Sequence, residues 1–231
     1  MKALKLSLFA SAMMLGSFTM TAQTADEVMT KHVAAVGGDS WGKLTSMKKV
    51  VTMSYQGMEM KMTETKLKGK GMRTDISVMG TENYVIVTPT GAWAYMPMQG
   101  ATKAEALPDD QLKASLPQMD ITDDLVGYKE KGIKAEFVGK EDLNGKPAFK
   151  LTLTDKEGNS STAYFDASTY YKVRETATQQ GQEVTTDYSD FKKFPEGVVI
   201  AMKSSNAFAE QTISSLELNK PVDEAIFKPS N

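Results

Sequence analysis

Residues 47–98 decide the fold and read MKKVVTMSYQGMEMKMTETKLKGKGMRTDISVMGTENYVIVTPTGAWAYMPM. Methionine stands at every second position from Met58 to Met62, with Glu59 and Lys61 between. Alternation with a period of two is typical of a β-strand that has one face in water and one face buried. The same pattern recurs before and after, with glycine-containing breaks, and predicts five consecutive antiparallel strands.

The buried face of this stretch carries methionine where a stable core would carry leucine or valine. Methionine is unbranched and polarizable, so it suits surfaces that fit ligands of irregular shape. The alternative is an ordinary core that uses methionine, but flexible methionine specifies a packed core poorly. We therefore expect a cavity for an apolar ligand. Its predicted lining is Met53, Tyr55, Met58, Met60, Met62, Met72, Arg73, Trp93, Tyr95, Met96, Leu112 and Leu116.

Arg73 is the one charged residue in this predicted lining. Apolar cavities enclose most of a ligand, while a few polar groups fix its orientation. We predict this role for Arg73, and the alternative is that its side chain lies on the solvated face of the sheet.

The beginning of the 231-residue chain predicts export. Lys2 and Lys5 precede an apolar stretch over residues 6–20, and small residues follow, so residues 1–23 are interpreted as a signal peptide. No later segment reaches the roughly 18 unbroken apolar residues that span a bilayer. The chain has no cysteine, which excludes disulfides, thiolate metal sites and lipid attachment at an N-terminal cysteine. We expect a periplasmic protein without a lipid anchor, with residues 24–231 forming one domain.

Outside the deciding stretch, the sequence predicts one early helix and many more strands. Apolar residues recur at helical spacing over residues 25–36, Gly37 supplies a stop, and Asp39 can cap a short second helix. From residue 47 onward, strands and turns continue almost to the end, including a hairpin turn at Asn144 and Gly145. About eleven or twelve strands are typical of a barrel or a strongly curved sheet, so the fold class is mainly β.

The strand pattern is interrupted between residues 101 and 132. Helix formers there predict one helix capped by Asp109, and a second capped by Asp120 or Thr122 that carries Leu125 and Val126. Compact domains usually connect strands with about 4 to 6 residues. We therefore interpret this long insert as a helical lid over an open sheet.

Catalysis, metal binding and nucleic-acid binding find little support. His32 is the only histidine, and it lies on the apolar stripe of a predicted helix rather than beside a candidate nucleophile. The acidic pairs Asp109–Asp110 and Asp123–Asp124 fall in the helical insert, where capping and solvation explain them. The net charge of −2 comes without a basic tract. We expect no enzyme, no cofactor, no metal and no nucleic-acid partner.

Four short motifs resemble exported proteins of the LolA-like group, the outer membrane lipoprotein-sorting proteins of the Bacteroidetes type. The resemblance extends over nearly all of residues 24–231. Its motifs are ADEVMTKHVAAVGG at residues 25–38 followed by Trp41 and Leu44, GAWAYMP at residues 91–97, residues 123–140 around YKEKG, and LNKP at residues 218–221 followed by Phe227.

This resemblance implies a half-open antiparallel barrel of about eleven strands, closed on one side by helices and lined for acyl chains. Members of the group carry lipoproteins across the periplasm to the outer membrane. The first hypothesis is therefore a monomeric periplasmic carrier for the acyl chains of lipoproteins or lipids, with an inner-membrane donor and an outer-membrane acceptor as candidate partners. The alternative is a non-catalytic structural or interaction module of the envelope with a filled core.

Overall fold

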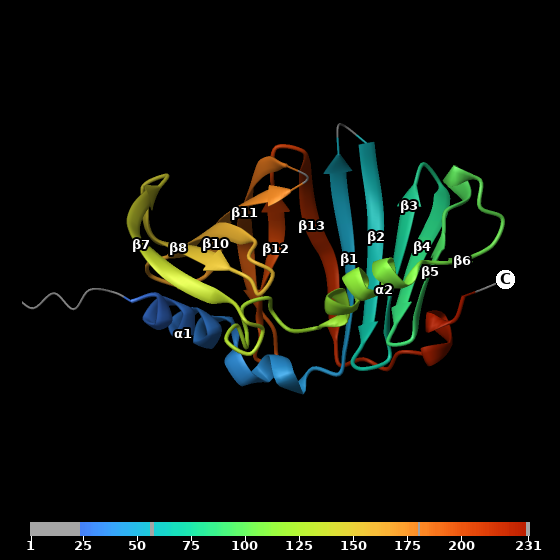
Figure 1. Cartoon of the computed structure of the whole chain (residues 1–231), viewed down its shortest axis with the longest axis horizontal. Helices are drawn as coiled ribbons and strands as arrows, with labels where there is room; N and C mark the ends of the chain where they lie inside the picture. The colour runs from blue at the N-terminus through green and yellow to red at the C-terminus, as the bar shows by residue number, and fades with distance from the viewer. Residues whose placement is uncertain (1–23, 56–57, 180, 230–231) are drawn as a thin grey trace, which may run out of the picture.

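The computed structural model describes residues 24–55, 58–179 and 181–229, and the predicted signal peptide lies outside these residues. In this part of the chain, thirteen strands form one sheet in the order β6-β5-β4-β3-β2-β1-β13-β12-β11-β10-β9-β8-β7 (Figure 1). The strands are β1 (Ser46–Tyr55), β2 (Met58–Leu67), β3 (Gly71–Val78), β4 (Thr81–Thr88), β5 (Gly91–Tyr95), β6 (Glu105–Ala106), β7 (Lys134–Leu143), β8 (Lys146–Thr154), β9 (Ser160–Asp166), β10 (Lys172–Gln179), β11 (Gln182–Lys193), β12 (Val199–Ser205) and β13 (Ala209–Leu218).

The sheet is antiparallel throughout and open. Strands β1 and β13 pair in its middle and so join the two halves of the chain, while β6 and β7 form its outer edges. The predicted mainly β, half-open architecture is confirmed. The strand count exceeds the predicted eleven, partly because β6 has only two residues, which is too short to show an alternating pattern.

The methionines of β1 and β2 share one face of the sheet. Met62 lies opposite Val51 on β1 and Ile76 on β3, and Met60 lies opposite Met53. Directly opposed residues of antiparallel strands place their side chains on the same face. We call this face, which also carries Met72 and Val87, the inner face.

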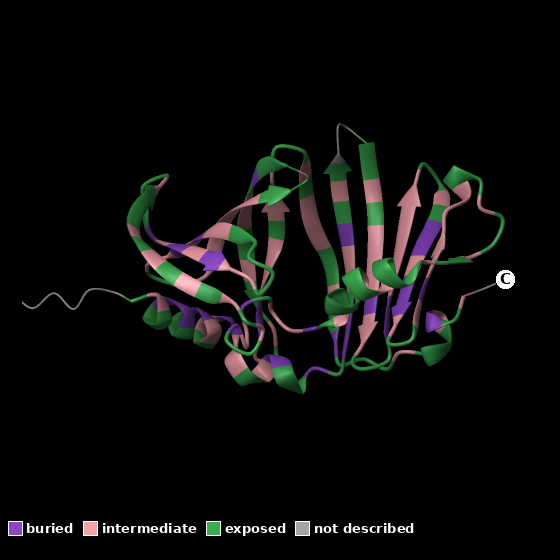
Figure 2. Ribbon diagram, viewed as in Figure 1, coloured by how far each residue is buried: buried purple, intermediate pink, exposed green. Residues whose placement is uncertain are grey.

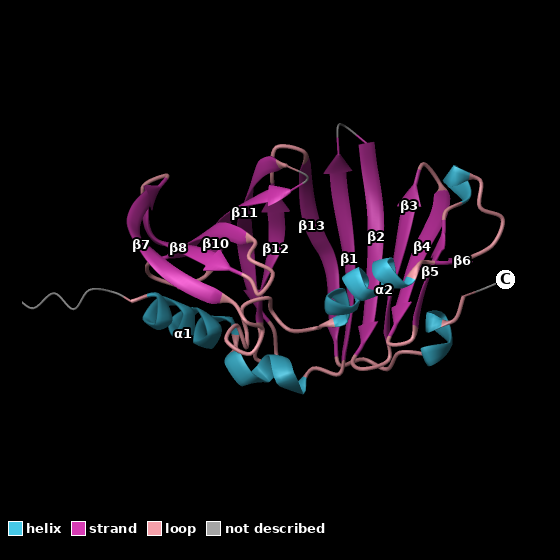
Figure 3. Cartoon of the chain, in the orientation of Figure 1, coloured by secondary structure: helices cyan, strands magenta, loops and turns pink. Residues whose placement is uncertain are grey.

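Helix α2 (Asp109–Ser115) covers part of the inner face and is followed by the 3₁₀ turn η3 (Leu116–Met119). In Figure 1, and by secondary structure in Figure 3, α2 lies in front of the first strands. Leu112 packs against the buried cluster of Met72 and Val87. The predicted helix is confirmed, but Asp109 is its first residue rather than its cap, because Pro108 occupies the N-cap position without a side-chain hydrogen bond.

The predicted second helix of the insert does not form, and residues 122–126 make turns instead. Oδ1 of Asp120 accepts the backbone N–H of Thr122, and Oδ1 of Asp123 accepts that of Leu125. Such local carboxylate–backbone bonds compete with helical ones. The buried side chain of Leu125 fixes this turn segment to the body of the protein.

Helix α1 (Ala25–Val36) confirms the sequence prediction. Thr24 and Glu27 form a reciprocal capping box at its beginning, and Gly37 ends it with φ 115°. The 3₁₀ helix η1 (Gly38–Lys43) follows directly. The predicted cap at Asp39 is wrong, because Gly37 is the N-cap and no side chain caps η1.

The outer face is covered near the C-terminus by the 3₁₀ turn η4 (Glu224–Phe227). Phe227 is buried in a cluster with Tyr84 and Ile86 of β4. A further turn, η2 (Pro97–Gln99), follows β5. Figure 2 shows buried positions on both halves of the sheet, while the hairpin ends of the strands are mostly exposed or half-buried.

Candidate ligand-binding cavity

A cavity of about 330 Å³ lies on the inner face where β1, β2 and β11 to β13 meet α1 and the insert. Its apolar wall includes Val51, Met62, Phe191, Ile200 and Ile213. Ligand sites for small molecules typically have volumes of about 300 to 1,000 Å³. The space left by the protein atoms is therefore large enough to hold part of an apolar ligand.

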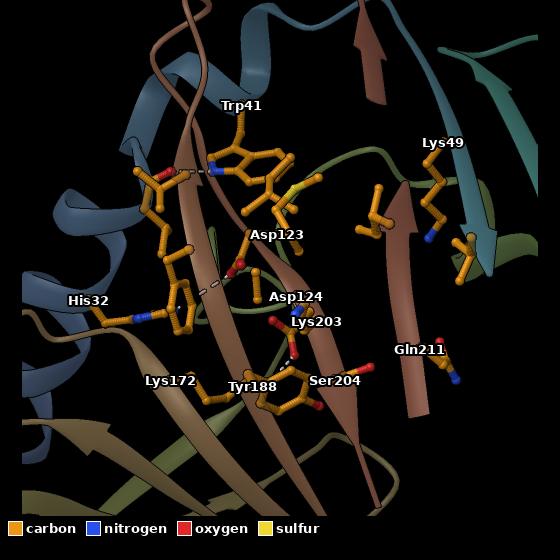
Figure 4. Close-up of a pocket in the computed structure, with 18 of the residues that line it drawn as sticks. His32, Trp41, Lys49, Asp123, Asp124, Lys172, Tyr188, Lys203, Ser204 and Gln211 are labelled. Atoms are coloured by element: carbon orange, nitrogen blue, oxygen red, sulfur yellow. Dashed lines mark hydrogen bonds and ion pairs between the residues drawn. The ribbon is translucent and has the colours of Figure 1, made fainter. Parts of the chain in front are cut away.

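One end of the cavity is polar. His32 from α1, Asp123 and Asp124 from the insert, Lys172 at the beginning of β10 and Tyr188 of β11 all line it (Figure 4). Elements far apart in the sequence supply this set. A ligand that filled the cavity would meet an apolar wall and a charged end.

The position of His32 is fixed on three sides. Its side chain is 2% exposed, and Nδ1 lies 2.8 Å from the carbonyl oxygen of Tyr170, to which it donates. The ring of Phe165 stands edge-on at a centroid distance of 5.0 Å. Nε2 lies 3.7 Å from Oδ1 of Asp123 and has no hydrogen-bond partner among the described residues. His32 therefore lies on the buried side of α1, as its position on the predicted apolar stripe implies.

Asp123 remains ionised in this setting. Burial alone would raise the pKa of its carboxyl group. His32, the backbone N–H of Leu125 and the charge of Lys172 together hold that pKa below its ordinary value. The polar end therefore presents a carboxylate to the cavity at neutral pH.

Lys172 is the central cation of the polar end. Its Nζ lies 2.6 Å from Oδ2 of Asp124 and 2.8 Å from Oε2 of Glu175, and 5.3 Å from the centre of the Tyr188 ring. Burial disfavours the ammonium form, but the two carboxylates raise the pKa of Lys172 above its ordinary value. The side chain is 11% exposed, so the ion pairs are shielded from solvent on the lysine side.

The predicted lining residues on β1 and β2 lie on the inner face. Met62 lines the cavity itself. Beyond Met62, the next inner-face positions toward the end of β1 and the beginning of β2 are held by Met53, Met60 and Met58. Met58, at the beginning of β2, is exposed. The side chain of Tyr55 lies outside the described residues.

The other predicted lining residues lie elsewhere. Met72 of β3 packs against Leu112 of α2. Leu116 lines a second cavity of about 300 Å³, beside Trp41. Met96 is half-buried and precedes η2.

Arg73, Trp93 and Tyr95 lie on the outer face, because they alternate with the inner-face positions of β3 and β5. Arg73 stacks on the Tyr84 ring at 4.3 Å, and its guanidinium donates to Asp75 and to the carbonyl oxygen of Ile226. These contacts tie the C-terminal turn to the sheet and do not face the cavity.

Lys172 and Tyr188 were not found by sequence reasoning. Each is an isolated polar residue in a strand, with no motif around it, and its neighbours in the site are distant in the sequence. The helix-capping role predicted for the acidic pair Asp123–Asp124 is wrong, because no helix forms there and Asp123 instead accepts the backbone N–H of Leu125 in a turn. Its position beside the buried histidine depends on how the insert crosses the sheet.

Two further properties concern the described residues alone. Their helices are all too short or too polar to cross a membrane. Among these residues, histidine, aspartate and glutamate side chains nowhere gather in a group of three or more that could hold a metal ion.

No protein-family model matches the sequence, and no curated protein matches it. Several solved structures have a similar fold. An outer membrane lipoprotein-sorting protein domain from Vibrio parahaemolyticus has a TM-score of 0.55 at 14% identity, with 87% of this chain and 94% of that chain covered. A DUF1329 family protein from Desulfovibrio piger has a TM-score of 0.59 at 14% identity, covering 88% and 97%.

A LolA superfamily protein from Nitrosomonas europaea has a TM-score of 0.57 at 12% identity, covering 90% of this chain and 98% of that chain. Likeness at this level of identity establishes the fold, and it agrees with the resemblance that the sequence motifs suggested. The chain has a LolA-like fold over most of its length.

Proposed function

We propose that this protein is a periplasmic, non-enzymatic carrier that binds the acyl chains of lipoproteins or lipids and delivers them to the outer membrane. The observation that carries the proposal is the cavity on the inner face, whose apolar wall continues into the methionine row of β2. The LolA-like fold supports it. Export through the signal peptide at residues 1–23 is part of the proposal.

The chemistry of the wall suits a carrier, which must both capture and release. Burial of an acyl chain contributes about 0.8 kcal/mol per methylene. Methionine side chains adapt to a bound chain without forming a rigid complementary surface. Several methylene groups in the cavity therefore suffice for capture, and the loosely specified wall keeps release accessible.

The hairpin ends of the strands support delivery. Four of the six exposed large apolar side chains of the described residues lie near the ends of strands, on the same side of the sheet. These four, which we call the hairpin rim, are Met58 at the beginning of β2, Met79 between β3 and β4, Met98 in η2 and Phe208 between β12 and β13. Figure 1 shows the β3–β4 and β12–β13 connections along its upper side. An apolar rim is a suitable place for a ligand to leave.

The geometry of the polar end supports a non-enzymatic role. A serine or cysteine nucleophile is activated by a hydrogen bond to a base such as histidine. In the described chain, Nε2 of His32 accepts no such bond, and the side chain that faces it is the carboxylate of Asp123.

Displacement of a neutral fluorescent probe, N-phenyl-1-naphthylamine, by a lipid tests the carrier proposal. Met62→Asp places a charge in the cavity wall, and we expect it to weaken probe binding at least tenfold in a folded protein. Met79→Asp is the matched control, because this side chain is 84% exposed at the hairpin rim. Mass spectrometry of organic extracts of the purified protein should detect copurifying lipid.

Equal probe affinity in wild-type protein and Met62→Asp would contradict the proposed cavity. Absence of both probe binding and copurifying lipid would favour the alternative, a structural or interaction module of the envelope.

A further inference from the structure

Methionine carries all the sulfur of this chain. The sequence has 16 methionines and no cysteine. Peroxides oxidise a thioether to a sulfoxide, and the reaction replaces an apolar side chain by a polar one. The positions of the methionines therefore decide what an oxidant does to this protein.

Five methionines lie on the wall of the proposed ligand site, and we call them the wall methionines. Met62 and Met202 line the cavity itself. Met60 occupies the next inner-face position of β2, directly opposite Met53 of β1, and Met58 lies two residues further. Within the described ranges, these five side chains neither belong to nor pack against the buried apolar clusters. They form a surface for a ligand rather than part of the core.

A small oxidant can reach the wall methionines. Met58 is 46% exposed, and the other four are half-buried. The neighbouring cavity of about 330 Å³ is many times the volume of a water molecule, about 30 Å³, and hydrogen peroxide is only one oxygen atom larger. An empty ligand site therefore admits peroxide to the sulfur atoms.

Three other methionines are protected, and we call them the core methionines. Met29, Met47 and Met72 are at most 8% exposed, and each belongs to a different buried cluster. Met72 also lies on the inner face, but Leu112 of α2 packs against its cluster. Peroxide therefore reaches the ligand surface before it reaches the core, so oxidation should change binding before it changes the fold.

The reaction itself is simple. Hydrogen peroxide transfers one oxygen atom to the sulfur, which gives up two electrons, while the O–O bond breaks and the second oxygen leaves as water. The new S=O group is a strong hydrogen-bond acceptor. Beside a bound hydrocarbon chain it finds no donor, so binding the chain costs the hydrogen bonds that this oxygen makes with water. Sulfoxides in the wall should therefore weaken the binding of an acyl chain.

We propose that the wall methionines are an oxidation site that controls ligand binding. Their thioether form holds an acyl chain, and their sulfoxide form releases it. This inference rests on the proposed carrier function and adds regulation of the same site. A methionine sulfoxide reductase restores the wall by taking two thiols to a disulfide while the sulfoxide oxygen leaves as water.

Oxidation with hydrogen peroxide, followed by its removal and a measurement of N-phenyl-1-naphthylamine affinity, tests the proposal. In wild-type protein, peptide mass spectrometry should find sulfoxides at the wall methionines while the core methionines remain thioethers. The dissociation constant should rise about tenfold, which corresponds to about 1.4 kcal/mol. Circular dichroism should show an unchanged fold. Methionine sulfoxide reductases with dithiothreitol should restore the affinity.

Leucine at all five wall positions keeps apolar side chains of similar volume and removes the sulfur. The variant combines Met53→Leu, Met58→Leu, Met60→Leu, Met62→Leu and Met202→Leu. Each protein is compared with itself before and after peroxide, so its starting affinity does not enter the comparison. Peroxide should change the affinity of this variant by less than about twofold, because leucine has no sulfur to oxidise.

The matched control combines Met79→Leu with Met98→Leu. These methionines are 84% and 55% exposed and lie outside the cavity lining. Peroxide should weaken probe binding by the control about tenfold, as in wild type. Saturation of wild-type protein with the probe during peroxide treatment should slow oxidation of the wall methionines severalfold and leave oxidation of Met79 and Met98 unchanged.

Wall sulfoxides that leave probe affinity unchanged would overturn this inference and leave the carrier proposal intact. An equal loss in the leucine variant and in wild type would also overturn it, and so would a control that keeps its affinity, because the effect would then arise outside the wall. Oxidation of the core methionines as fast as the wall methionines would contradict the order of access. If unoxidised wild-type protein does not bind the probe, the carrier proposal fails together with the inference.

Discussion

Nζ of Lys172 lies 2.6 Å from Oδ2 of Asp124, and this ion pair fastens the insert to strand β10 (Figure 4). It holds the side chain of Asp124 at the polar end of the cavity, while the buried Leu125 fixes the turn segment itself. The pair therefore connects the stability of the fold with the geometry of the site.

Lys172→Met should destabilise the protein by about 2 kcal/mol, since hydrogen bonds to charged groups contribute about 1.5 to 3 kcal/mol. Most of the loss should come from Glu175, whose carboxylate is 23% exposed, because Asp124 is 60% exposed and water screens its charge. Urea unfolding measures the free energy. Lys156→Met is the control, as its partner Glu157 is exposed, and it should change stability by less than about 0.5 kcal/mol. Equal effects of the two substitutions would contradict a structural role for Lys172.

Glu175 should contribute to acid sensitivity. Burial would raise the pKa of its carboxyl group, but the charge and hydrogen bond of Lys172 lower it below the ordinary value. When folding lowers the pKa of a carboxyl group, the ionised group stabilises the folded protein at pH values above the pKa it has in the unfolded chain, about 4.3 for glutamate. This stabilisation is lost as the pH falls through the pKa of the folded state. The unfolding free energy of wild-type protein should therefore fall more between about pH 5 and pH 3 than that of Glu175→Gln. Parallel pH profiles for the two proteins would show that the carboxylate is not stabilised by folding.

Gly37 sets the position of α1, and with it His32. The residue has φ 115°, and a Cβ atom added there would collide with the carbonyl oxygen of Gly197 in the turn between β11 and β12. Gly37→Ala should lower stability by about 1 to 3 kcal/mol, the usual cost of a strained backbone position. Gly42→Ala is the matched control, because a Cβ at Gly42 meets no atom within 4 Å. Thermal unfolding of the two variants checks this, and similar melting temperatures would contradict the expected clash.

The strands were largely predictable because their signals are local. The Asn144–Gly145 turn has positive φ at both residues, 56° and 83°, as a two-residue hairpin requires, and flanking alternation places the strands. The capping box of α1 is equally local. The false helix over residues 122–126 arose because Asp120 and Asp123 can either cap a helix or form turns, and the sequence alone does not distinguish these outcomes.

The cavity was predictable only in part. Alternation indicates that Met62 and Met60 share a face, and they do. It also makes Arg73 and Met72 face opposite sides, so both could not line one surface of the sheet. The polar end depends on long-range contacts between His32, Asp123 and Lys172, and spacing along a single sequence carries no information about these contacts.

The hairpin rim should affect delivery rather than capture. Met79 and Phe208 are exposed at two hairpin ends, outside the residues that line the cavity. Met79→Ser combined with Phe208→Ser should therefore leave probe affinity within about twofold of wild type. Release of a bound fluorescent fatty acyl probe to phosphatidylcholine vesicles should slow severalfold, because apolar rim side chains can enter the vesicle surface and serine side chains cannot.

The vesicle concentration separates two routes of release. If the rim contacts the membrane, the wild-type transfer rate should rise with vesicle concentration, and the double variant should lose most of this dependence. Val138→Ser is the control, since Val138 is also an exposed apolar residue and lies on β7, away from the rim. A transfer rate independent of vesicle concentration in all three proteins would mean that the ligand leaves through water, and the rim would then have no role in delivery.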